Sequence, residues 1–161
     1  MKLSFFSLAS GSSGNCYYLG TPDFGILIDA GISFRTIKKV LKDNNIDISK
    51  IAAVLVTHDH ADHIKTVGYL GEKMYLPIYS TADVHRGIDN SRYVEETLNG
   101  SRRIIQKEVP FMIRDFSIVA FEVPHDSTDN VGYHICYKEH KFTFATDVGH
   151  ITDTVKKYMS M

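Results

Sequence analysis

The sequence contains only two cysteines, Cys16 and Cys136, among its 161 residues. Two cysteines cannot build a disulfide framework, and both lie within apolar segments, so we expect two buried free thiols. The scarcity of cysteine favours a reducing, cytoplasmic location over secretion.

Long hydrophobic runs are also missing. No apolar segment approaches the length of a membrane span, so we expect no membrane partner. The apolar N-terminal stretch is short and is interrupted by Ser4 and Ser7, which favours a first strand over a secretion signal. We find no internal repeat, low-complexity segment or linker in the chain.

An excess of positive charge is absent as well. The formal net charge is −1, so no overall basic field favours a nucleic-acid partner. Lysine and arginine gather only locally, and solvated surface explains each cluster better than a phosphate-binding track. The clusters are Lys38, Lys39 and Lys42; Arg102, Arg103 and Lys107; and Lys156 and Lys157.

Hydrophobic residues make up 43% of the sequence, which is enough for the core of one globular domain over residues 1–161. Three strands come first and helices then alternate with strands, so we predict a layered α/β fold. The expected strands cover residues 3–8, 15–19, 25–29, 51–57, 76–79, 103–106, 116–123, 131–137 and 141–145. The expected helices cover residues 33–44, 63–70 and 81–88, and residues 111–115 are expected to form a turn.

The buried strand at 51–57 runs directly into the segment T-H-D-H-A-D-H. His58 and His60 are two residues apart, so at the end of an extended strand they point the same way and can bind one ion. Asp62 and His63 follow where the chain turns, and they can reach a second ion. Imidazole and carboxylate groups suit zinc and similar metals, and this set is typical of a two-metal hydrolase. The alternative, a polar loop with solvated histidines, explains so dense a cluster less well.

Three other strand ends carry residues of the same kinds. Asp29 precedes a glycine turn and can accept the N–H of a metal-bound histidine, although taken alone it is better explained as an ordinary turn residue. His125 follows another buried strand, and this shared layout favours a third ligand for the first ion over a lone loop histidine. Asp147 adds a carboxylate after the last expected strand. His85 is expected to be structural or exposed, and we assign no role to His134, His140 or His150.

The motif at 57–63 resembles the H-x-H-x-D-H signature of the metallo-β-lactamase superfamily. Within that superfamily, S-L-A-S-G-S-S-G-N at 7–15 resembles the opening of the YycJ-like subfamily, whose members act as DNA exonucleases. Further matches are H-D-S-T-D-N-V-G-Y at 125–133 and T-D-x-G at 146–149. The resemblance implies a metallo-β-lactamase-like αβ/βα sandwich, in which the Gly/Ser turn at 9–14 lies at the edge of the metal cleft.

The resemblance also implies roles for individual residues. A first ion is expected at His58, His60, His125 and Asp147, and a second at Asp62, His63 and Asp147. Asp62 and Asp147 are the expected catalytic residues, and Asp29 is expected to hold a ligand histidine. The expected cofactor is zinc, up to two ions, with manganese as an alternative.

The expected activity is hydrolysis by a metal-bound hydroxide, acting on DNA as a phosphodiesterase or exonuclease. Two alternatives stay open: hydrolysis of a small ester, thioester or lactam, and an inactive metal-binding remnant. Activity on a phosphodiester against a thioester would separate the first from the second.

The superfamily pattern contains one more histidine after a further strand, whereas this chain stops at Met161. We therefore expect the C-terminal part of the fold to be missing, with an incomplete second metal site and impaired activity. Uncovered strands near the C-terminus would then favour a dimer or larger homo-oligomer.

Overall fold

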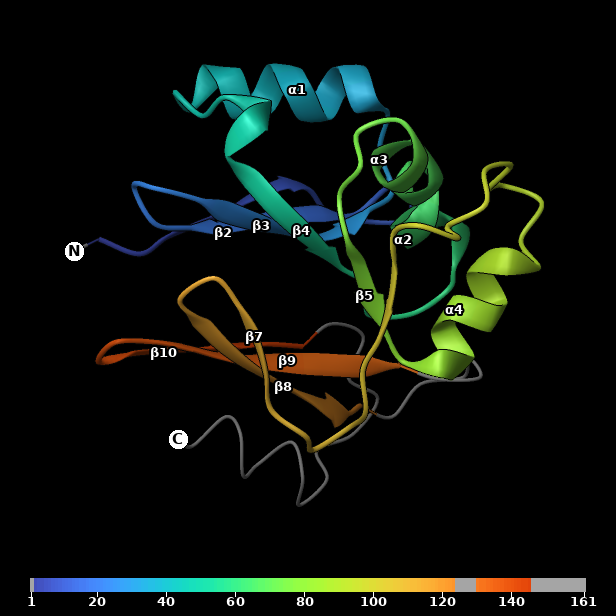
Figure 1. Cartoon of the computed structure of the whole chain (residues 1–161). Coiled ribbons are helices and arrows are strands. Elements are labelled where there is room, and N and C mark those ends of the chain that lie inside the picture. Colours follow the sequence, from blue (N-terminus) through green and yellow to red (C-terminus); the bar gives the residue numbers. More distant parts are fainter. Residues whose placement is uncertain (1, 124–129, 146–161) are drawn as a thin grey trace.

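The computed structural model describes residues 2–123 and 130–145. These residues form two stacked sheets, with helices over the outer face of the first sheet (Figure 1). The strands are β1 (Ser4–Ala9), β2 (Cys16–Gly20), β3 (Gly25–Ala30), β4 (Ile51–Leu55), β5 (Ile78–Ser80), β6 (Arg102–Ile104), β7 (Phe111–Ile113), β8 (Phe116–Glu122), β9 (Val131–Tyr137) and β10 (His140–Phe144). The helices are α1 (Phe34–Asp43), the 3₁₀ turn η1 (Ile48–Lys50), α2 (Ala61–Ile64), α3 (Val67–Glu72) and α4 (Ala82–Asp89).

The first sheet has the strand order β1-β2-β3-β4-β5-β6 in the described part of the chain. The pairs β1–β2 and β2–β3 are antiparallel, whereas β3–β4, β4–β5 and β5–β6 are parallel. Parallel neighbours end at the same edge of a sheet. The chain that leaves β3 and the chain that leaves β4 therefore emerge side by side, and this edge carries the candidate site.

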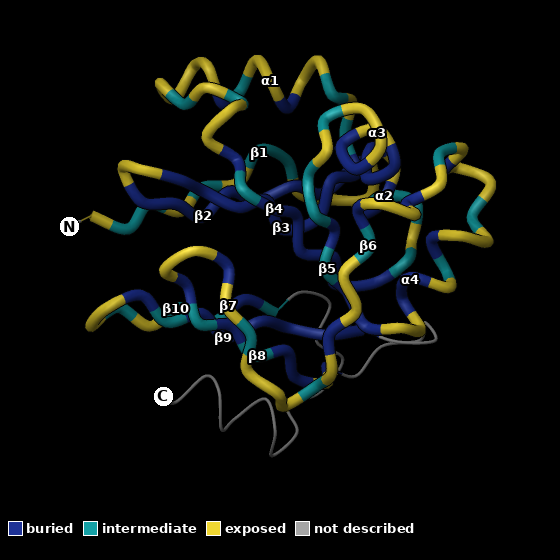
Figure 2. The backbone as a smooth tube through the Cα atoms, in the orientation of Figure 1, coloured by how far each residue is buried: buried dark blue, intermediate teal, exposed yellow. Residues whose placement is uncertain are grey.

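The second sheet is antiparallel and has the order β10-β9-β8-β7 within the described residues. One cluster of apolar side chains fills the space between the sheets, including Leu55 from β4 and Tyr133 from β9. A second cluster joins the first sheet to its helices, including Leu27 from β3 and Ile37 from α1. Figure 2 shows that the central strands are buried and that α1 is exposed along its outer side. These layers confirm the predicted α/β class.

Two details of the secondary structure differ from the prediction. Residues 111–115 were expected to be a turn, but Phe111–Ile113 is the short strand β7, and Arg114 makes the turn with a φ of 50°. Three residues are too few to show an alternating pattern. The single helix expected over 63–70 is two helices, because Thr66 leaves the helical path: its N–H donates to Ala30 O and its hydroxyl to Ile32 O.

The cysteine prediction is confirmed for Cys16, which is buried, while Cys136 is half-buried; both are free thiols. Burial raises the pKa of the Cys16 thiol, so this thiol stays protonated. No helix in the described ranges combines the length and the apolar character that a membrane crossing needs.

The backbone of α2 lies directly against the end of β3. Asn15 N–H donates to Asp62 O over 2.7 Å, and Gly31 N–H donates to Asn15 O over 2.8 Å. A Cβ atom at Gly31 would collide with the carbonyl group of Asp62 and would lie 2.8 Å from His63 N. Glycine at position 31 therefore allows the T-H-D-H-A-D-H motif to rest on the first sheet.

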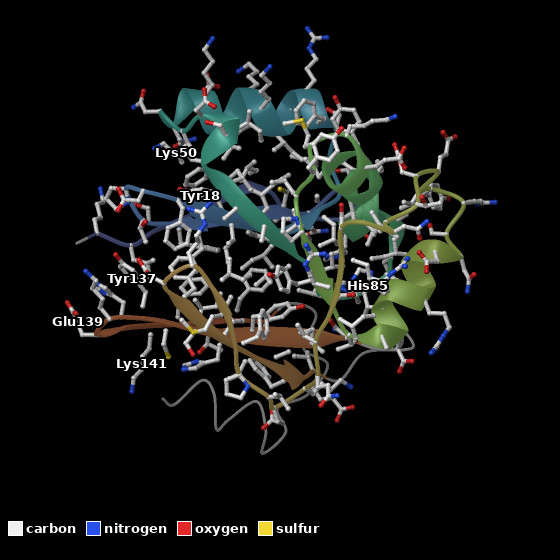
Figure 3. The ribbon with its side chains drawn as sticks, viewed as in Figure 1. Tyr18, Lys50, His85, Tyr137, Glu139 and Lys141 are labelled. Carbon is white, nitrogen blue, oxygen red and sulfur yellow. The ribbon has the colours of Figure 1, made fainter. Side chains whose placement is uncertain are left out.

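Helix α4 is fixed to the sheet by a buried histidine, His85, which Figure 3 labels beside that helix. Its Nε2–H donates to Ile78 O over 2.9 Å and to Arg103 O over 3.2 Å, so one side chain joins α4 to β5 and β6. The structural role expected for His85 is confirmed. On the same helix, Gly87 lies against the carboxylate of Asp59, and a Cβ atom there would meet that carboxylate.

Replacing Gly31 with alanine is expected to lower the free energy of unfolding by roughly 1–3 kcal/mol, because the methyl group overpacks against the backbone of Asp62. Gly100→Ala is the matched control, since nothing lies within 4 Å of a Cβ atom at that position. Denaturant titrations of both variants measure the difference. Equal stability of the two would contradict the close approach of α2 to β3.

The stability of the fold should fall in mild acid because of His85. Burial lowers the pKa of His85 below its ordinary value of 6.5, and Nδ1 has no hydrogen-bond partner among the described residues. The unfolded chain binds the His85 proton more tightly than the folded chain does. The contribution of neutral His85 to the free energy of unfolding is therefore complete above pH 6.5 and is lost as the pH falls toward the folded-state pKa. In His85→Gln, which keeps a side-chain N–H but does not titrate, denaturant titrations at several pH values should show a shallower decline. An unchanged pH dependence would exclude His85 as its source.

Candidate metal centre

The candidate site is built on one buried carboxylate, that of Asp29, which is fully buried near the end of β3. The pairing of β2 with β3 aligns Cys16 with Ala30 and Tyr17 with Ile28, so Asp29 is the extra residue of a β-bulge. Its φ of 63° lies in the left-handed region, which aspartate tolerates better than most residues. The bulge turns the Asp29 side chain toward the end of β4.

Three donors satisfy the Asp29 carboxylate. Thr57 N–H donates to Oδ1 over 2.8 Å, and the Thr57 hydroxyl donates to Oδ2 over 2.7 Å. His63 Nδ1 lies 2.6 Å from the same Oδ2. A buried charge requires such partners, because burial removes its hydration. Asp29 therefore joins the chain after β4 to helix α2.

The same hydrogen bonds set the tautomers of two histidines. Because Oδ2 of an ionised carboxylate can only accept, His63 Nδ1 is the protonated nitrogen of that ring. The Thr57 hydroxyl proton is directed to Asp29, so Thr57 Oγ1 accepts from His58 Nδ1–H over 2.9 Å. Both rings consequently carry their lone pair on Nε2, the nitrogen that faces away from Asp29.

The motif side chains form one cluster at the edge of the sheet. The ring centroids of His58 and His60 are 4.7 Å apart, and those of His58 and His63 are 3.9 Å apart. His63 Nε2 lies 3.6 Å from Asp62 Oδ2. His58 and His63 are buried while His60 is exposed, so one side of the cluster packs against the protein and the other side reaches solvent.

Asn15 orients the carboxylate of Asp62 and was not singled out from the sequence. Its Nδ2 donates to Asp62 Oδ2 over 3.1 Å and also to Gly11 O over 2.8 Å. The Gly/Ser turn at 9–14 is thereby held beside the motif, where the resemblance predicted it. The asparagine at the end of S-G-S-S-G-N was the available signal, but only the fold shows that it meets Asp62.

The donor set fits a borderline divalent metal, since imidazole nitrogen and carboxylate oxygen are its usual protein ligands. Five of the predicted site residues, Asp29, His58, His60, Asp62 and His63, lie together. The predicted ligands His125 and Asp147 lie outside the described residues. Within residues 2–123 and 130–145, no three such side chains are arranged to hold an ion by themselves. Two predicted ligands of the first ion fall in the remaining segments.

The other histidines lie away from this cluster. His134 is in β9, where its Nδ1 is 2.8 Å from Thr143 Oγ1, and His140 begins β10. His85 binds the backbone carbonyls of β5 and β6. His150 lies outside the described residues.

Comparison with known proteins finds a matching family model and related proteins of similar sequence. A family model described as "Beta-lactamase superfamily domain" matches residues 25–160. The chain is 33% identical over 146 residues to exodeoxyribonuclease WalJ of Streptococcus pneumoniae, covering 91% of this chain and 54% of WalJ. It is 31% identical over 156 residues to exodeoxyribonuclease YycJ of Bacillus anthracis, covering 97% of this chain and 58% of YycJ. The chain thus spans about half the length of the curated relatives it matches.

Solved structures of metallo-β-lactamase-fold proteins superpose on most of this chain. The structure of Zn²⁺-bound PqqB from Methylobacterium extorquens superposes with a TM-score of 0.74 at 16% identity, covering 89% of this chain and 56% of PqqB. At such low identity the likeness shows the fold alone. Because the family model matches most of the sequence, including the T-H-D-H-A-D-H motif, the chain belongs to the metallo-β-lactamase superfamily.

Proposed function

We propose that this chain is a metal-dependent nuclease that hydrolyses phosphodiester bonds in DNA as an exonuclease. The observation that carries the proposal is the hydrogen-bonded series His58–Thr57–Asp29–His63, which directs two Nε2 lone pairs away from Asp29, beside His60 and Asp62. The names of the relatives WalJ and YycJ, both exodeoxyribonucleases, support DNA as the substrate.

The proposed ligands follow the motif. His58 and His60, with His125 and Asp147, would hold a first ion, and Asp62, His63 and Asp147 would hold a second. Zinc is the expected ion, with manganese as the alternative. When bound, such ions lower the pKa of coordinated water to about 7, which supplies a hydroxide nucleophile, and stabilise negative charge on the attacked phosphoryl group.

The residues that the structure describes would act by orienting the side chains of the proposed ligands. Asp29 keeps His58 and His63 in the tautomer that leaves Nε2 unprotonated, and it holds both rings against the sheet. Asn15 directs the Asp62 carboxylate, which we propose to accept a proton from the attacking water. His60 lies on the exposed side, where substrate approaches the cluster.

Two further expectations remain predictions. They are a single domain over residues 1–161 and a cytoplasmic location.

Asp29→Asn is expected to weaken zinc binding roughly 10- to 100-fold, because an amide cannot accept from all three donors at once. Competition titration against a chromogenic chelator measures the affinity, and circular dichroism checks the fold. Asp115→Asn removes the same charge from an exposed turn and should leave zinc affinity unchanged. Unaltered affinity in the Asp29 variant would exclude its proposed role.

Hydrolysis of labelled DNA should be lost when metal is removed by a chelator and should return when zinc or manganese is added. The rate should rise with pH toward a plateau near neutrality, because the attacking water must be deprotonated. A full rate after exhaustive chelation would contradict metal dependence. Turnover of a thioester but not of DNA would favour the small-molecule alternative, and metal binding without turnover would favour an inactive remnant.

A further inference from the structure

A cavity of about 480 Å³ lies at the opposite end of the first sheet from the candidate metal centre. Lys50, which directly precedes β4, lines it, whereas His58 lies beyond the other end of that strand. The extended path between these two residues is roughly 25 Å. A group bound in this cavity therefore cannot also contact the metal-ligand cluster. The volume is in the range of ligand pockets.

A buried tyrosine, Tyr18, also lines the cavity. Two glycines make room for its side chain: a Cβ atom at Gly20 would collide with the Tyr18 hydroxyl, and one at Gly25 would lie 2.6 Å from the hydroxyl oxygen. The ring of Phe6 stacks on it with centroids 5.0 Å apart. The Tyr18 side chain is 3% exposed, and its hydroxyl makes no hydrogen bond to any residue that the structure describes.

The Tyr18 hydroxyl can donate a hydrogen bond, and no described residue accepts one from it. Burial raises the pKa of Tyr18, so the phenol keeps its proton and can donate to a bound group. The hydroxyl oxygen is not sealed from solvent, so water or a ligand group can accept its proton. Because Tyr18 lines the cavity, an acceptor bound there can receive this hydrogen bond.

Lysine side chains surround the same region. Lys2 and Lys50 line the cavity, and Lys38 and Lys42 line an adjoining cavity of about 500 Å³ that shares its wall at 45–47. None of the four forms an ion pair with a carboxylate in the described part of the chain. Figure 3 shows Tyr18 and Lys50 near one another on this side of the molecule.

Among the residues that line the two cavities, the one carboxylate is already engaged. Asp47 Oδ1 accepts from Ser49 N–H over 2.8 Å and caps η1. Hydrogen bonds from Ser49, followed by the nearby charges of Lys38 and Lys50, lower the pKa of Asp47. One ionised aspartate among four lysines leaves the two adjoining cavities positively charged.

We propose that this cavity binds the phosphate group of a nucleotide, with Lys2 and Lys50 supplying charge and the Tyr18 hydroxyl supplying a directed hydrogen bond. Lysine binds phosphate as a point charge, and the phosphate oxygens accept strong hydrogen bonds. Phe6, Pro22 and Ile46 provide apolar wall for the nucleoside. The phosphate belongs either to a free mononucleotide or to the backbone of a single-stranded DNA.

This inference departs from the sequence interpretation of Lys38, Lys39 and Lys42 as one solvated cluster. Lys39 alone pairs with a neighbour, Asp43, over 2.8 Å, and it does not line either cavity. Lys39→Ala is therefore a matched control, because it removes one lysine charge from the same region but leaves the cavities intact.

The test is a set of binding titrations in the presence of chelator, so that no metal can bind phosphate. The probes are inorganic phosphate, adenosine 5′-monophosphate and a short single-stranded DNA. Wild type is expected to bind the nucleotide or the oligonucleotide, and Lys50→Ala and Tyr18→Phe should each weaken that binding at least roughly tenfold. Lys39→Ala should bind like wild type. Circular dichroism confirms that each variant is folded.

The probes separate the two sources of phosphate. Binding of adenosine monophosphate that depends on Lys50 and Tyr18 identifies a nucleotide site, and dependence seen only with the oligonucleotide identifies a backbone contact. Failure of all three probes to bind wild type would overturn the proposal. Equal weakening by Lys39→Ala and Lys50→Ala would also overturn it, since that result is expected of unspecific charge.

The inference does not rest on the proposed nuclease function. His58→Ala should lose metal but should keep metal-independent binding in the cavity. If His58→Ala abolished that binding while remaining folded, the two sites would not be separate and the proposal would fail.

Discussion

The structure depends on the burial of one charge, the carboxylate of Asp29. A buried carboxylate costs several kcal/mol unless hydrogen bonds replace its hydration. Here the replacement comes from Thr57 at the end of β4 and from His63 in α2. The requirement to satisfy one side chain thus fixes three segments relative to each other: the bulge in β3, the end of β4 and the first turn of α2.

This constraint explains how the T-H-D-H-A-D-H motif is given a defined shape by its neighbours. The parallel pairing of β3 and β4 brings their ends together, and the absence of a side chain at Gly31 lets α2 rest on β3. Asn15 then holds Asp62 from the opposite side. Orientation of the proposed ligands is therefore supplied by residues outside the proposed ligand set, as in many metal sites.

The sequence predicted the layered α/β fold and the residues that cluster at the strand ends, because apolar runs and ligand types are local features. It could not identify Thr57 or Asn15, whose roles depend on partners that are distant in the sequence. The break at Thr66 arises from contacts with Ala30 and Ile32, and the three residues of β7 are too few for a pattern. His125 and Asp147 remain predictions, since they lie outside the described residues.

Asp29 sets the tautomers of two histidines, so that both direct an unprotonated Nε2 away from Asp29. Long-range ¹H–¹⁵N correlation spectra of the metal-free protein, recorded under mildly alkaline conditions, measure this directly, because the two tautomers give different ¹⁵N shifts and coupling patterns. The account predicts that His58 and His63 are both protonated at Nδ1. A spectrum in which either ring is protonated at Nε2 would contradict it.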